Sequence, residues 1–104
     1  MEKLNKIIDT LEDLKVKDLA VYDFEKTSPF YDFFVIATVN ERQGNAAINH
    51  LKKALVAEDI KNIEGKGGSW TLVDCHDVIV HLFQENDRKF YGFDQRLLGY
   101  KRIK

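Results

Sequence analysis

The sequence has little of what marks several common protein classes. It has one cysteine, Cys75, so no disulfide can form within the chain and no cysteine-based metal spacing is possible. It has one proline, and no repeat, linker or low-complexity segment divides its 104 residues. No apolar run approaches the roughly 20 residues that a membrane span requires. The acidic, amphipathic N-terminus has the features of neither a signal peptide nor an Arg-rich transit peptide. These absences predict a cytoplasmic protein without a membrane partner.

Excess positive charge is also missing. The formal net charge is -1, whereas binding to bare nucleic acid needs clustered Lys and Arg, so we expect no sequence-specific nucleic-acid partner. The charge is uneven, because the tail after Asp94 has four basic residues and no acidic one. A content of 44% hydrophobic and 32% charged residues is ordinary for a soluble globular protein. The length fits one domain, residues 1–104.

The order of predicted elements indicates an α/β fold. Apolar residues at helical spacing predict a helix over residues 2–15. Residues 18–24 form a predicted strand, and the almost continuously apolar residues 31–39 predict a strand covered on both faces. Asn40 and Gln43 form a capping-box pattern before a helix that runs to about residue 57. With a short strand at residues 61–64, this segment is a βαβ unit whose two strands are parallel.

The segment from residue 64 to residue 83 predicts a β-hairpin. With Cys75 and His76 as its turn, Asp74 lies opposite Asp77 and Trp70 opposite His81. Alternation then gives one aliphatic face, which consists of Thr71, Val73, Val78, Val80 and Leu82. The other face is too polar for a core and too apolar for an ordinary surface, which suits contact with a partner. Its members are Trp70, Leu72, Asp74, Asp77, Ile79 and His81.

The polar residues of this hairpin favour few chemistries. Asp74 and Asp77, if opposed, repel each other, and either a metal ion or a Lys or Arg of a partner relieves the repulsion. Zinc needs three or four convergent ligands, but Cys75 and His76 lie at the turn while His81 is a strand length away. The Gly-rich loop at residues 65–69 lacks the Walker spacing and leads into a strand, so it predicts a plain loop rather than a phosphate site. We therefore predict no metal and no cofactor.

The residues after Phe83 give a weaker pattern. Residues 84–100 predict a short helical or irregular segment in which Phe90, Tyr91 and Phe93 pack back onto the sheet. A basic tail follows, which we expect to fray.

Several segments together resemble one family. They are DFFVIAT from Asp32, Arg42-Gln43, Glu64-Gly65, WTLVD from Trp70, DVIVHLF from Asp77, and Arg88 with Phe90 and Tyr91 in an R-x-F-Y pattern. In this order and spacing they resemble the Iojap family of ribosomal silencing factors (RsfS). Two departures are a Cys-His turn where the family usually has Tyr-Gly, and a basic tail where the family often has Leu-Trp and acidic residues.

The resemblance implies a single mixed α/β domain with a roughly five-stranded sheet and flanking helices, nucleotidyltransferase-like but without catalytic residues. It implies a non-enzymatic protein that binds the large ribosomal subunit through its universal ribosomal protein fourteen and blocks subunit joining, so repressing translation under nutrient limitation. It also implies a homodimer off the ribosome. The proposed partner-binding residues are Trp70, Leu72, Asp74, Asp77, Ile79 and His81, with Arg88 and Tyr91 at the rim.

Two alternatives stay open at this point. One is a metal-dependent nucleotidyl- or phosphoryl-transfer enzyme that uses Asp74 and Asp77. The other is a homodimer in which the mixed face of the hairpin serves only as the self-interface.

Overall fold

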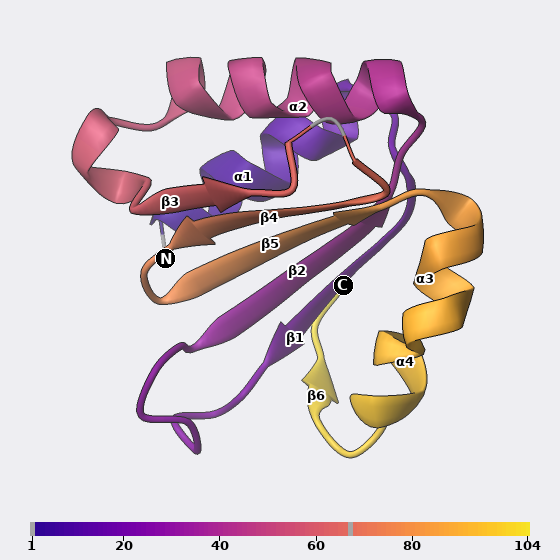
Figure 1. Cartoon of the computed structure of the whole chain (residues 1–104). Coiled ribbons are helices and arrows are strands. Elements are labelled where there is room, and N and C mark those ends of the chain that lie inside the picture. The colour runs from indigo at the N-terminus through magenta and orange to yellow at the C-terminus, as the bar shows by residue number, and fades with distance from the viewer. Residues whose placement is uncertain (1, 67) are drawn as a thin grey trace.

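A computed structural model describes residues 2–66 and 68–104. It shows a mixed sheet of six strands in the order β3-β4-β5-β2-β1-β6, which confirms the predicted α/β class (Figure 1). The strands are β1 (Lys17–Asp23), β2 (Phe33–Thr38), β3 (Asn62–Glu64), β4 (Trp70–Cys75), β5 (Val78–Phe83) and β6 (Lys101–Arg102). Only β2 and β5 are parallel neighbours; β1–β2, β1–β6, β3–β4 and β4–β5 are antiparallel. The strands β2 and β3 run parallel, as predicted, but β4 and β5 lie between them.

Two helices cover one face of this sheet, which we call the back face (Figure 1). They are α1 (Glu2–Asp13) and α2 (Glu41–Ala54), and a 3₁₀ turn, η1 (Ala57–Asp59), follows α2. The predicted capping box is confirmed, since the Asn40 side chain accepts from the Gln43 N–H and the Gln43 side chain accepts from the Asn40 N–H. Leu11 and Leu51 are fully buried against the strands. The back face is therefore a closed, aliphatic core.

The hairpin β4–β5 forms with a register different from the predicted one. Its turn is His76-Asp77, so Asp74 pairs with Ile79 and Trp70 with Phe83. Cys75 remains in the strand because its side chain is completely buried in the back-face core. Asp74 Oδ1 accepts from the His76 N–H at 2.9 Å, and His76 has a φ of 70°, a left-handed conformation that suits a tight turn. The change in register is two residues, so the side chains within β4 and β5 keep their predicted faces. Asp77 is the exception, because it now lies in the turn.

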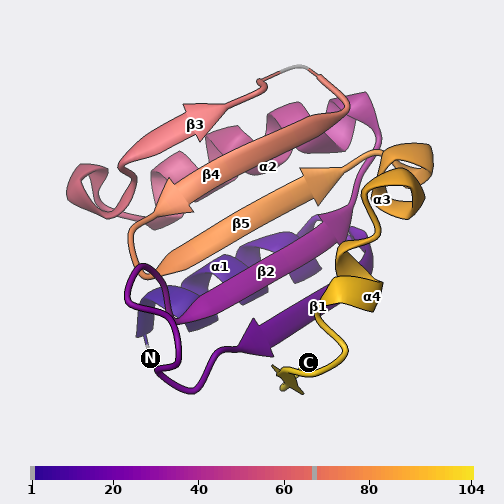
Figure 2. The same cartoon turned by 60° about the horizontal axis from the view of Figure 1, so that its bottom comes forward.

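The opposite face, which we call the front face, is covered at one end only (Figure 2). Two short helices, α3 (Glu85–Tyr91) and α4 (Phe93–Arg96), lie across the ends of β2 and β5 and the start of β4. They contribute Tyr91 and Phe93 to a second, largely aromatic cluster. Its buried members are Ala20, Tyr22, Phe24, Ile36, Phe83 and Leu97, with Tyr31, Phe34, Trp70, Tyr91 and Phe93 packed against them.

Two expectations for the C-terminal segment were wrong. Phe90 does not pack back onto the sheet, because its side chain is 82% exposed on the outer side of α3. The tail does not fray, since β6 pairs with β1 and the main chains of Val21, Ile103 and Lys104 exchange hydrogen bonds. This pairing makes the sheet six-stranded where five strands were predicted.

Candidate functional site

Trp70 lies at the boundary between the covered and the open part of the front face. Its ring centroid is 4.6 Å from that of Tyr91 on α3 and 5.5 Å from that of Phe93, the first residue of α4. It also stacks on Phe83, its cross-strand neighbour, at 5.1 Å. The side chain is nevertheless only partly buried. Trp70 therefore packs inside this aromatic cluster and presents its remaining surface to solvent.

His81 lies beneath the cluster rather than on its surface. It is 3% exposed, and its Nδ1 accepts a hydrogen bond from Trp70 Nε1 at 3.2 Å. The rings of Phe34 and Phe93 meet it edge to face, at 4.6 and 4.9 Å. Burial lowers the pKa of His81 to about 4, so the imidazole is neutral near pH 7. Such a buried ring cannot offer a charge to a partner.

The open part of the front face continues from Trp70 toward the hairpin turn. Leu72, Asp74 and Ile79 are partly exposed there, on adjacent strands. The loop between β1 and β2 borders this area with Phe30, whose side chain is 81% exposed. A hollow lies beside the turn and is lined by Phe30, Tyr31, Lys61, Asp74, His76, Asp77 and Ile79. We call Trp70, Leu72, Asp74 and Ile79 with this hollow the open surface.

Asp77 lines this hollow, but its carboxylate is paired with a lysine of the helix layer. Its Oδ1 lies 2.5 Å from Lys3 Nζ of α1, in an ion pair that lacks hydrogen-bond geometry. Lys3 also donates to the Cys75 carbonyl at 2.8 Å. The carboxylate thus faces the helix layer, and Asp74 and Asp77 are not opposed as the predicted turn required. The direct pairing of the two carboxylates that suggested a cation at this hairpin is therefore not formed.

Arg88 is bound within the molecule and does not project from a rim. Its guanidinium forms two hydrogen bonds to the Asp94 carboxylate, at 2.9 and 3.0 Å. It also donates to Thr38 Oγ1 at 3.0 Å and to the main-chain carbonyl of Asp18. The side chain is 11% exposed, and it holds the pKa of Asp94 below its usual value. Arg88 therefore ties α3 and α4 to β1 and β2.

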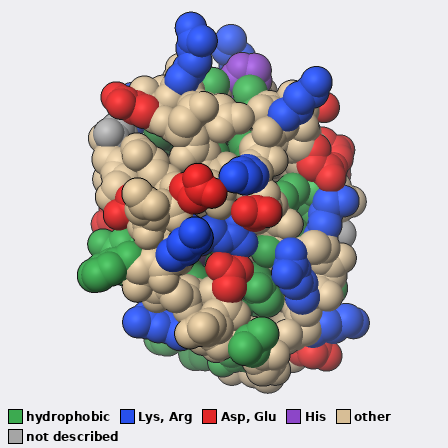
Figure 3. All heavy atoms as spheres, turned by 90° about the vertical axis from the view of Figure 1, so that its right-hand side faces the viewer, with side chains coloured by type: hydrophobic (Ala, Val, Ile, Leu, Met, Phe, Trp, Pro, Cys, Tyr) green, Lys and Arg blue, Asp and Glu red, His purple; other side chains and the backbone are tan. Residues whose placement is uncertain are grey.

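The side of the molecule that carries α3 and α4 shows acidic and basic side chains interleaved (Figure 3). A shallow depression there is lined by Asp18, Thr38, Glu85, Arg88, Lys89, Asp94 and Arg102. Because both signs of charge alternate, this side has no field of one sign that would attract a polyanion.

The Gly-rich loop has a role in positioning Trp70 that its sequence did not reveal. Gly65 has a φ of 72°, and a Cβ at this position would lie 2.2 Å from the carbonyl oxygen of Trp70. Glycine alone permits this close approach. The Thr71 hydroxyl donates to the Gly65 carbonyl at 3.2 Å. Gly67 lies outside the described residues.

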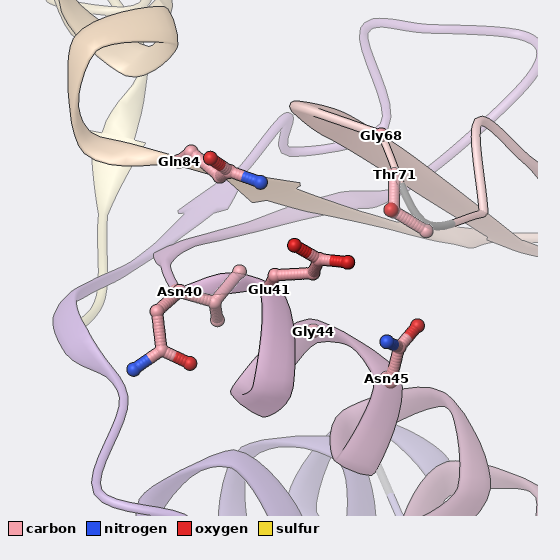
Figure 4. A pocket seen from close by; sticks show the side chains of 8 residues that line it. Asn40, Glu41, Gly44, Asn45, Gly68, Thr71 and Gln84 are labelled. Atoms are coloured by element: carbon pink, nitrogen blue, oxygen red, sulfur yellow. The ribbon is translucent and has the colours of Figure 1, made fainter.

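A narrow pocket separates this loop from the start of α2 (Figure 4). Glu41, Asn45, Thr71 and Gln84 line it, and the Glu41 carboxylate points into the space between them. A carboxylate there opposes the binding of a phosphate, and the loop enters β4 rather than a helix. Over residues 2–66 and 68–104, no three His, Cys, Asp or Glu side chains gather as a metal site would require. Within the same residues, none of the helices combines the length and the hydrophobicity that a membrane-spanning helix needs.

The structure adds front-face residues that the sequence did not single out. Tyr31 and Phe34 join the aromatic cluster, and Phe30 borders the open surface. Strand β2 is almost entirely apolar, so its pattern could not show which of its residues face the front. Only the pairing of Phe34 with Ile79 and Tyr22 assigns it to that face.

Comparison with solved structures supports the fold. A crystal structure of a Chromobacterium violaceum protein superposes with a TM-score of 0.84 at 32% identity, covering 99% of this chain and 88% of the other. A crystal structure of a Bacillus halodurans protein gives a TM-score of 0.82 at 27% identity, covering 99% of this chain and 97% of the other.

Comparison of sequences gives a family. A ribosomal silencing factor of Chromobacterium violaceum is 32% identical over 106 residues, covering 97% of this chain and 87% of the relative. The chloroplastic protein Iojap of Arabidopsis thaliana is 33% identical over 85 residues, which are 79% of this chain and 36% of that protein. The family model described as "ribosomal silencing factor during starvation" matches residues 1–97. The fold and these matches agree, and the chain belongs to the ribosomal silencing factor family.

Proposed function

We propose that this protein binds the large ribosomal subunit through its universal ribosomal protein fourteen and blocks the joining of the small subunit. It thereby represses translation when nutrients are scarce, and it acts in the cytoplasm. Membership of the family supports the ribosome as the target. The observation that carries the proposal is the open surface, where a half-buried tryptophan borders aliphatic side chains and a carboxylate.

The composition of the open surface suits a protein partner. Trp70 is a large aromatic anchor of the kind that dominates binding energy, and Leu72 and Ile79 extend the apolar centre. Asp74 supplies a negative group for a Lys or Arg of the partner. Tyr91 packs on Trp70 at the edge of the surface, so it is retained as a rim residue.

The other predicted residues contribute indirectly in this proposal. Asp77 pairs with Lys3 and shapes the turn end of the surface. Arg88 secures the α3–α4 end, and His81 lies under Trp70. Their substitution is expected to act through the positions of their neighbours.

Steric exclusion needs only a bound body of sufficient thickness. The shortest principal extent of the chain is 22 Å. Contacts between ribosomal subunits require their surfaces to touch directly or through a water molecule. A domain of this thickness, bound where the small subunit would join, keeps the two surfaces too far apart. The mechanism requires no catalytic step, and we propose that the protein is not an enzyme.

Trp70→Ala tests the proposal. It is expected to weaken binding to purified large subunits by about 2 kcal/mol or more, the loss typical of an interface hot spot, as measured by co-sedimentation. Phe90→Ala is the matched control, because Phe90 is an exposed aromatic on α3 outside the open surface. The wild type, but not Trp70→Ala, should also reduce the joining of added small subunits in sucrose gradients. Equal binding by both variants and the wild type would contradict the proposal.

Two further measurements address the alternatives. Calorimetric titration with magnesium or manganese and a nucleotide should give no site-specific heat, whereas an enzyme of the transfer class should give one. Light scattering tests the homodimer: if Trp70→Ala abolishes a dimer but leaves ribosome binding intact, the open surface is a self-interface only.

A further inference from the structure

We propose that His81 is a positioning residue, whose neutral imidazole fixes the orientation in which Trp70 meets its partner. This inference rests on the proposed function, because it concerns how the binding anchor is presented.

The hydrogen bond between the two side chains defines that orientation. An indole has one N–H and no acceptor, so Trp70 Nε1 must be the donor and His81 Nδ1 the acceptor. His81 Nδ1 is then unprotonated, and the proton of the neutral ring is on Nε2. A partly exposed Trp rotates about two side-chain bonds, and a directional bond at its N–H restricts both. The bond thus selects which edge of Trp70 remains exposed.

His81 can restrain Trp70 because it is itself immobilised. Phe34 and Phe93 hold the imidazole edge to face, and Phe83 stacks on it at 6.1 Å. These rings come from β2, β5 and α4, so three elements determine the direction of the Nδ1 lone pair. The position of the helices is thereby transmitted to the exposed anchor.

Packing alone does not account for a histidine here. His81 Nε2 is buried and has no hydrogen-bond partner among the described residues, which lowers stability. A leucine would fill a site surrounded by aromatic rings without that cost. Burial lowers the pKa of His81 to about 4, so the acceptor is present at neutral pH. The feature that distinguishes histidine from leucine in this pocket is its acceptor toward Trp70.

Two variants of the full chain separate orientation from packing. His81→Leu removes the acceptor and keeps an apolar side chain of similar size, whereas His81→Asn retains an acceptor close to the position of Nδ1. We expect the midpoint of urea unfolding of His81→Leu to equal or exceed that of the wild type. We nevertheless expect this variant to bind purified large subunits about tenfold more weakly. We expect His81→Asn to recover most of the binding despite its smaller volume.

Trp70 is the only tryptophan, so its indole N–H gives a single resonance that reports the bond directly. In the wild type this proton should exchange slowly with solvent, and the His81 ring should show an unprotonated Nδ1. In His81→Leu the proton should exchange faster while the main-chain amides of β4 and β5 stay protected. This readout in the wild type also tests the inference if a variant fails to fold.

The outcomes distinguish this inference from the proposed function. If Trp70→Ala binds large subunits as the wild type does, the docking surface itself is wrong. If Trp70→Ala weakens binding but His81→Leu does not, the surface stands and the positioning role is overturned. Equal loss in His81→Leu and His81→Asn, or a protonated Nδ1 in the wild type at neutral pH, also overturns it.

Discussion

The two faces of the sheet are closed to different extents. The back face is covered by α1 and α2, which have 12 and 14 residues, and its core is aliphatic. The front face is covered by α3 and α4, which have 7 and 4 residues, and its cluster is aromatic. A few large rings bury much area per residue, so two short helices suffice to hold one end of the front face. The remainder stays open beside a rigid aromatic base.

This difference suggests that the back face mainly stabilises the fold and the front face mainly binds a partner. Burial of apolar area on the closed back face supplies most of the stability. The front face buries less apolar area, because part of it is uncovered. It keeps an exposed aromatic side chain with aliphatic neighbours, as a docking site requires. Substitutions on the two faces should therefore affect different measurements.

The largest effect on stability is expected at Leu51, which α2 buries completely in the back-face core. Leu51→Ala should lower the free energy of unfolding by about 3 kcal/mol, because it removes apolar contacts and leaves a cavity. Leu72→Ala, at a half-exposed front-face position, should cost about 1 kcal/mol or less. Urea denaturation measures both.

Binding should show the reverse order for this pair. Leu72→Ala is expected to reduce co-sedimentation with large subunits, and the folded fraction of Leu51→Ala should bind like the wild type. Equal losses of stability in the two variants, or a normal affinity of Leu72→Ala for large subunits, would contradict the proposed difference between the faces.

The second effect concerns the attachment of α3 and α4. Arg88→Ala should cost between about 2 and 3 kcal/mol, because it removes the donor to the Thr38 hydroxyl and leaves the Asp94 carboxylate only the longer bond from the Tyr22 hydroxyl. Arg88→Lys should recover little, since a single ammonium cannot replace the two-pronged contact. Arg96→Ala, at an exposed position on α4, is the control. In Arg88→Ala, hydrogen exchange should accelerate more in α3 and α4 than in α1. Full recovery of stability by Arg88→Lys would contradict the role of the two-pronged contact in attaching these helices.

The smallest effect is a pH dependence that belongs to the front face. His81 has a pKa of about 4 when folded, against 6.5 ordinarily, so between these values the unfolded chain binds more protons. The free energy of unfolding is therefore highest above pH 6.5 and decreases as the pH falls toward 4. At pH 5 it should be lower by about 2 kcal/mol. The lowered pKa of Asp94 acts below 3.8 and does not contribute in this window. Urea titrations at pH 7 and pH 5 test this.

His81→Leu is the matched comparison, and it should remove most of the difference between pH 7 and pH 5. An unchanged pH dependence in His81→Leu would assign the effect to other groups.

Much of the fold could be predicted because its signals are local. Helical spacing predicted α1, and the Asn40–Gln43 capping box marked the start of α2. The faces of the residues within β4 and β5 were predicted correctly although the turn, with Asp77, was not. Alternation depends only on whether the register changes by an odd or an even number. The turn itself depended on the burial of Cys75 under α1 and α2, which no local pattern contains.

By itself, the sequence determined which hairpin residues share a face, since strand geometry alternates side chains regardless of what packs on them. Only the tertiary structure decided which of those residues remain accessible. Helices α3 and α4 cover His81 and one side of Trp70, Lys3 binds Asp77, and Asp94 binds Arg88. Each of these partners is remote in sequence or lies on another element. Burial and ion pairing depend on which elements meet in space, so a local sequence pattern cannot contain them.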